Sequence, residues 1–138
     1  MTTQDIEKLT QETRNLKLLY VEDDTLARES TLEILEIFFE DITVAVDGKN
    51  GLELFENNSF DIVITDINMP KMNGIDMILN IKKINKNVII LILSAHDDIK
   101  YFSDTIGIEV QEYLFKPINI EQFMSLLAKS VSTFNLGK

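Results

Sequence analysis

The stretch DIVITDINMPKMNG, residues 61–74, decides the fold, because it passes from an apolar run into a polar turn and then toward an amphipathic segment. The apolar run, Ile62–Thr65, has the length and β-branched composition of a buried strand. Beyond the turn, apolar residues recur at helical spacing, at Ile75, Ile78, Leu79 and Ile81. The stretch therefore predicts a strand, a turn that begins with Asp66, and a helix.

The same strand and helix unit recurs along the whole chain. Short apolar runs predict five strands: Leu16–Val21, Ile42–Val46, Ile62–Thr65, Val88–Leu93 and Glu112–Phe115. A segment of helical spacing follows each run, with apolar positions that begin at Leu26, Leu52, Ile75, Ile99 and Ile120. Strict alternation with continuous apolar central strands predicts an α/β, doubly wound (βα)5 fold, in which helices cover both faces of a parallel sheet.

Composition limits what the protein can do. The 138 residues include no cysteine, which excludes disulfides and thiolate metal sites. A formal net charge of −10 argues against direct binding to nucleic acid or anionic lipid, since both reward clustered Lys and Arg. No apolar run reaches the ~20 residues of a membrane span, and no secretory signal opens the chain. We expect a cytoplasmic protein.

The chain divides into three parts. Residues 1–14 are polar and of mixed charge, and we expect them to form a loose helix or to be disordered. Residues 15–134 carry the alternating pattern and have the length of one domain. We expect residues 135–138 to be a frayed tail.

Polar residues follow four of the five expected strands: Glu22, Asp23 and Asp24, then Asp66, then Ser94, and finally Lys116. In parallel sheets, ligands bind beyond the carboxyl ends of the strands, so we expect these side chains to share one rim. Carboxylates gathered there would raise each other's pKa values unless a cation joined them. Oxygen ligands without His or Cys favour a hard ion such as Mg²⁺, which suits Asp23 and Asp66.

A carboxylate beside a metal, a hydroxyl and a lysine can accept a phosphoryl group, because these neighbours neutralise the transferred charge. Asp66 would then be the nucleophile, and Ser94 and Lys116 would hold the phosphoryl oxygens. Each residue also has a structural explanation: Asp23 or Asp24 as a helix cap, Asp66 in an Asx-turn, Ser94 as a cap, and Lys116 as a solvated charge. These explanations leave the common rim unexplained.

Four motifs, in order, resemble the receiver domain of bacterial two-component response regulators over about residues 15–134. They are KLLYVEDD at 17–24, DIVITDINMPKMNG at 61–74, ILSAH at 92–96 and EYLFKP at 112–117. The resemblance implies a flavodoxin-like three-layer sandwich with strand order 2-1-3-4-5. It implies a signalling domain rather than an enzyme, one that catalyses only its own phosphorylation and dephosphorylation.

The resemblance also implies roles for individual residues. Asp66 would take its phosphoryl group from a phosphohistidine of a sensor histidine kinase or phosphotransfer protein, with Lys116 and Ser94 assisting. Mg²⁺ or Mn²⁺ would be held by Asp23, Asp66 and the backbone carbonyl of Asn68, with Glu22 acting through water. The Lys116–Pro117 peptide bond would be cis.

Phosphorylation would draw Ser94 toward the new oxygens and Tyr113 inward, as the resemblance implies. This change would reshape the face made by the fourth helix, fifth strand and fifth helix, which controls a partner or output module and allows a homodimer. Asn68 and His96 would tune the lifetime of the phosphorylated form; the alternative is that they are exposed loop residues without kinetic effect.

One feature departs from the family pattern. Glu109 stands where receivers have a glycine, and Gly107 lies two residues earlier, so the fourth helix could end sooner.

The same residues also bear on other functions. A constitutive interaction module that keeps the fold without the phosphorylation chemistry would usually have lost a pocket residue, and none is missing here. A multi-turnover phosphatase would need an aspartate where Asn68 stands. No output module fits after the fifth helix, so the chain is either a stand-alone receiver or part of a longer regulator.

Overall fold

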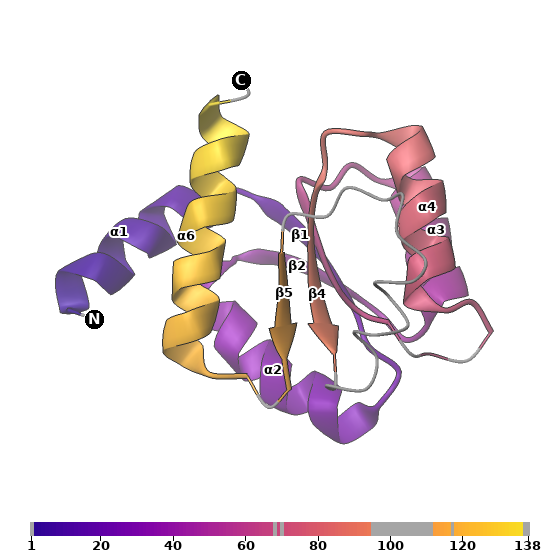
Figure 1. The fold of residues 1–138 in the computed structure, drawn as a ribbon, viewed down its shortest axis with the longest axis horizontal. Coiled ribbons are helices and arrows are strands. Elements are labelled where there is room, and N and C mark those ends of the chain that lie inside the picture. The colour runs from indigo at the N-terminus through magenta and orange to yellow at the C-terminus, as the bar shows by residue number, and fades with distance from the viewer. Residues whose placement is uncertain (1, 68, 70, 95–111, 117, 137–138) are drawn as a thin grey trace.

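The computed structural model describes residues 2–136 apart from 68, 70, 95–111 and 117, and only the backbone of Ser94, Glu112, Tyr113, Phe115 and residues 133–136 (Figure 1). The strands are β1 (Lys17–Val21), β2 (Asp41–Ala45), β3 (Ile62–Asp66), β4 (Ile89–Ser94) and β5 (Glu112–Phe115). The helices are α1 (Thr3–Thr13), α2 (Thr25–Phe38), α3 (Gly48–Asn57), α4 (Gly74–Ile84) and α6 (Ile120–Leu136). The helix expected around Ile99 and the departures at Gly107 and Glu109 lie outside the described residues.

All neighbouring strands pair in parallel, in the order β2-β1-β3-β4-β5, which confirms the predicted fold. The chain passes from β1 to one edge of the sheet at β2 and then crosses to β3 on the other side of β1. Strand order therefore reverses between β1 and β3. Ligands of such sheets bind at this reversal, beyond the carboxyl ends of the two strands.

Helices cover both faces of the sheet, with α3 and α4 on one side and α2 and α6 on the other (Figure 1). Successive strand residues point to opposite faces: Leu19 and Val63 pack into the α3 and α4 layer, and Leu18 and Ile62 into the α2 and α6 layer. All four side chains are fully buried. Burial of each stabilises the fold by roughly 1.5–3 kcal/mol.

Short polar side chains begin the helices that follow the strands. The Asp24 Oδ2 accepts a hydrogen bond of 2.8 Å from the Ala27 N–H at the start of α2. Asp47 and Asn73 cap α3 and α4 in the same way. These caps satisfy orphan backbone donors and keep the turns after the strands short. Asp24 is thus the cap of α2, which leaves the Asp23 carboxylate available for another role.

The first helix, α1, packs beside α2 and α6 toward the amino ends of the strands (Figure 1). It buries Leu9 in the α2 and α6 core layer. The Thr13 hydroxyl donates a hydrogen bond of 2.5 Å to the Phe38 carbonyl at the end of α2. The residues before β1 are therefore part of the packed structure. Among the described residues, no helix combines the length and apolar character that a membrane span requires.

Candidate functional site

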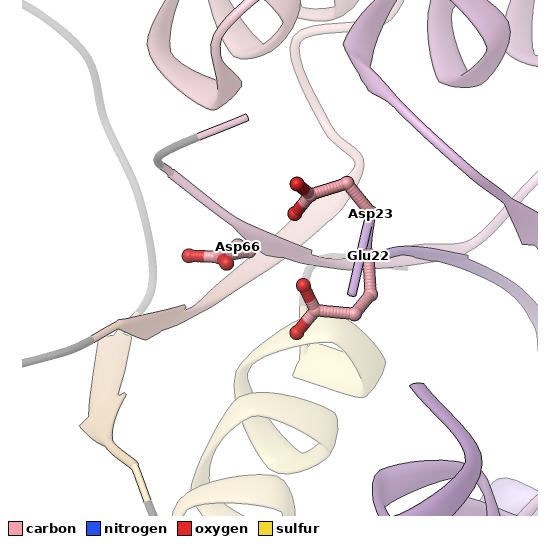
Figure 2. Close-up of side chains that lie close together, drawn as sticks. All are labelled: Glu22, Asp23 and Asp66. Atoms are coloured by element: carbon pink, nitrogen blue, oxygen red, sulfur yellow. The ribbon is translucent and has the colours of Figure 1, made fainter. Parts of the chain in front are cut away.

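Three carboxylates meet where strand order reverses. Glu22 and Asp23 directly follow β1, Asp66 ends β3, and the two strands are neighbours with Val21 opposite Thr65. One oxygen from each carboxylate lies within 4.8 Å of the others. Figure 2 shows the three side chains leaving adjacent strand ends toward a common space. Glu22 and Asp66 are buried, at 1% and 8% exposure, and Asp23 is half-buried.

Lys116 reaches the same place from the end of β5. Its Nζ donates hydrogen bonds to Glu22 Oε1 at 2.5 Å and to Asp66 Oδ2 at 3.1 Å. The lysine lies 94 residues from Glu22 in the sequence, and only the parallel sheet brings the two together. These contacts exclude the alternative of a solvated lysine.

The site holds more negative than positive charge, since three carboxylates face one ammonium. Burial, together with the nearby Asp66 charge, raises the pKa of Glu22 to about 7, although the Lys116 hydrogen bond acts to lower it. Burial alone would lower the pKa of Lys116, but the hydrogen bond that it donates to Glu22 and the charge of Asp66 raise it. The expected mutual effect of gathered carboxylates is therefore present at Glu22.

The Asp66 side chain is held at both oxygens. Its Oδ1 accepts a hydrogen bond of 2.7 Å from the Ile67 N–H, and its Oδ2 contacts Lys116. The Thr65 hydroxyl donates to the Asp66 carbonyl at 2.7 Å. Backbone and side chain are thus both oriented at the last residue of β3.

Gly74 lets helix α4 approach the end of β3 closely. A Cβ at this position would lie 2.3 Å from the Asp66 carbonyl oxygen and 2.7 Å from the Ile67 Cα. The Gly74 N–H also donates a hydrogen bond of 2.7 Å to the Ile67 carbonyl. In the sequence, Gly74 is only the last residue of the motif at 61–74, and its steric role depends on how α4 packs against β3.

Sequence reasoning missed Arg28. Its Nη1 donates to the carbonyl oxygens of Glu22 at 2.9 Å and of Asp23 at 3.4 Å. The one available signal was that Arg28 is the only Lys or Arg in the α2 segment, five residues after Asp23. The helical spacing of that segment identifies its apolar face and gives no information on the polar residue Arg28.

Other residues expected at the site are described in part or not at all. Leu93 pairs with Asp66 across β3 and β4, so the backbone of Ser94 lies one residue beyond that pair. Tyr113 belongs to β5, where it pairs with Ile92. The side chains of Ser94 and Tyr113, together with all of Asn68, His96 and Pro117, lie outside the described residues.

The described residues fit a hard divalent cation. All three potential ligands are carboxylate oxygens, and their spacing allows one ion to touch each of them. The Asp66 charge also contributes to the raised pKa of Glu22, an effect that a bound cation would offset. Mg²⁺ matches this donor set, since it favours oxygen ligands and usually keeps several waters.

Residues 18–128 match the family described as the response regulator receiver domain, and the chain therefore belongs to this family. Phosphoryl acceptance is the general function of these domains, which act in signalling.

Named relatives agree with this assignment. The chain is 35% identical over 120 residues to the transcriptional regulatory protein HptR of Staphylococcus aureus. This match covers 85% of this chain and 47% of the relative. The chain thus spans about half the length of the curated relatives it matches.

Solved structures share the fold. One is the N-terminal domain of an uncharacterized protein from Wolinella succinogenes, at 37% identity and a TM-score of 0.77, covering 88% of this chain and 98% of that one. Another is a receiver domain protein from Clostridium thermocellum, at 29% identity and a TM-score of 0.78, covering 89% of this chain and 99% of that one.

Proposed function

We propose that this receiver domain is a phosphorylation switch in which Asp66 accepts a phosphoryl group from a phosphohistidine of a sensor kinase or phosphotransfer protein. One observation carries the proposal: Lys116 Nζ and the carboxylates of Glu22 and Asp23 all converge on Asp66. A carboxylate with these neighbours can attack phosphorus while the charge on the transferred group is neutralised.

In the transfer, an Asp66 oxygen forms a bond to phosphorus as the phosphorus–nitrogen bond of the donor breaks. The donor imidazole leaves with the electron pair of that bond. Asp23 and Asp66 would hold Mg²⁺ or Mn²⁺ directly, with the Asn68 carbonyl, while Glu22 would act through water; the ion supplies charge neutralisation when bound. The Lys116 ammonium, already on Asp66 Oδ2, is placed to bind a phosphoryl oxygen.

The signal would leave the site through Ser94 and Tyr113. The end of β4 brings the Ser94 backbone beside Asp66, where a hydroxyl could bind the new phosphoryl group. Movement of Tyr113 in β5 would then alter the face that β5 forms with α6, which a partner or a second copy could bind. The expected fourth helix of this face lies outside the described residues. Asn68 and His96 would tune the phosphoryl lifetime. We propose that the switch acts in the cytoplasm, either as a stand-alone receiver or as one part of a longer regulator.

The test is incubation with Mg²⁺ and acetyl phosphate, followed by intact-mass spectrometry. Wild type should gain one phosphoryl group, and Asp66→Asn should gain none. The matched control is Asp61→Asn, which changes the aspartate just before β3, at its opposite end, and should be labelled like wild type. An unlabelled wild type would refute the proposal, and equal labelling of Asp66→Asn would show that another residue is the acceptor.

A further inference from the structure

Arg28 has an unusual position for a cation. It lies at the end of the first turn of α2, where the positive end of the helix dipole disfavours positive charge. It is half-buried, and its guanidinium turns back toward the acidic turn that follows β1. A local contact must offset the unfavourable helix position, and the backbone carbonyls of that turn provide it.

The turn between β1 and α2 is held to the helix residue by residue. Arg28 Nη1 donates to the carbonyls of Glu22 and Asp23, at 2.9 and 3.4 Å. The Arg28 backbone N–H donates to the Asp24 carbonyl at 2.9 Å, and the Asp24 side chain caps the helix at Ala27. Three consecutive backbone carbonyls of the turn are therefore bound by one residue.

The backbone carbonyls of the turn and its carboxylates have different partners. Arg28 occupies the carbonyls of Glu22 and Asp23, while the Glu22 carboxylate contacts Lys116 and that of Asp23 lies within the cluster around Asp66. A guanidinium is suited to hold two acceptors at once, because its several donors lie in one rigid plane. Rotation of either peptide group would change the backbone dihedral angles at Glu22 and Asp23, and these angles set the direction in which the two side chains leave the backbone.

We infer that Arg28 is a positioning residue of the metal site: it binds the backbone of Glu22 and Asp23 and so keeps their carboxylates directed at the ion. The inference rests on the proposed Mg²⁺-dependent function and extends it to a residue outside the acidic cluster. Residues that orient metal ligands from behind commonly change metal affinity when they are replaced.

A positioning role and a purely electrostatic role of Arg28 predict opposite changes in the Kd for Mg²⁺ when the residue is replaced. As a cation near the site, Arg28 repels Mg²⁺, so loss of its charge alone would tighten binding. As a positioning residue, it holds the ligands in place, so its loss would weaken binding. The direction of the change in Kd therefore separates the two roles without any measurement of phosphorylation.

The experiment is isothermal titration of the whole chain with Mg²⁺ at constant ionic strength. Arg28→Met keeps most of the apolar stem but removes both charge and donors, and we expect its Kd to rise on the order of tenfold. Arg28→Lys keeps the charge and one donor group and should lie between wild type and Arg28→Met. The matched control is Lys49→Met, which removes an exposed cation from the first turn of α3 and should leave Kd within error of wild type.

Circular dichroism checks that each variant is folded, and Arg28→Gln replaces Arg28→Met if the latter unfolds. An unchanged or lower Kd in the folded neutral variant overturns the inference, even if its melting temperature falls. A wild type that binds no Mg²⁺ overturns the proposed function itself, and the inference with it. Failure of the inference would therefore be seen only in the Arg28 variant, whereas failure of the proposed function would already be seen in wild type.

Discussion

Two aspartates at the two ends of β3 show what makes a site. Asp61 stands just before the strand and accepts one hydrogen bond, of 2.9 Å, from the Lys17 N–H in an exposed setting. Asp66 ends the strand, also accepts one backbone hydrogen bond, and is buried beside two further carboxylates and an ammonium. Both residues are aspartates whose side chain accepts a hydrogen bond from one backbone N–H. The difference comes from the topology, which gathers charge at the carboxyl ends of neighbouring strands.

The largest expected effect is at Gly74, because the carboxyl end depends on close backbone packing. In Gly74→Ala the new Cβ would meet the Asp66 carbonyl oxygen at 2.3 Å, so α4 or the end of β3 must shift. We expect a loss of about 3 kcal/mol in the free energy of unfolding, measured by urea denaturation. Gly51→Ala is the comparison, since its Cβ would meet the movable Met77 Sδ at 2.7 Å. Equal losses would show that a clash with the Asp66 backbone costs no more than a clash with the side chains of Met77 and Val21.

The next effect is at Lys116, whose ammonium contacts the buried carboxylates of Glu22 and Asp66 at the carboxyl end of the sheet. Lys116→Ala leaves the buried Glu22 without its ammonium, and we expect a loss of roughly 2 kcal/mol at pH 8. The loss should shrink at pH 6, where Glu22 can take up a proton instead.

The same Lys116→Ala variant also tests signalling. Its Mg²⁺ binding should persist, while phosphorylation should no longer move Tyr113, as followed by amide and ring NMR shifts. Unchanged coupling to Tyr113 would contradict the role given to the ammonium.

A third test uses pH in the presence of a chelator. Because the pKa of Glu22 is raised to about 7 in the folded chain, the folded state binds more protons than the unfolded state between about pH 4.5 and 7. Glu22 therefore lowers stability as pH rises through this window. Melting curves should show a flatter pH profile in Glu22→Gln than in wild type. The exposed Glu53→Gln serves as the control. A profile for Glu22→Gln that overlays wild type would mean that the carboxylate ionises normally.

The smallest effect is expected at the amino end of the sheet. Thr13→Val removes the hydroxyl that donates to the Phe38 carbonyl and should cost about 1 kcal/mol of unfolding free energy. Thr10→Val, whose hydroxyl bonds to Ile6 within its own helix, should cost less. Neither change should alter labelling by acetyl phosphate. Reduced labelling in Thr13→Val would show that the two ends of the sheet are coupled, and the contrast between them would weaken.

Much of the fold and part of the site could be predicted because they depend on patterns among residues close together in the sequence. Apolar runs and helical spacing predicted each described strand to within one residue at either end, and β3 extends through Asp66. The rim followed from topology, since residues after parallel strands meet at one edge. The N-terminal helix was left open between helix and disorder, because its own pattern is polar and its stability comes from Leu9 and Thr13 packing against distant segments.

The sequence by itself determined the alternation of strands and helices, the family, and the set Glu22, Asp23, Asp66 and Lys116, because periodicity and motif spacing are properties of neighbouring residues. Only the tertiary structure decided which of these touch. It joined Lys116 to Glu22, brought Gly74 onto the Asp66 backbone, and aimed Arg28 at the turn after β1. Such contacts depend on strand order and helix packing, which place residues far apart in sequence within a few ångströms of each other.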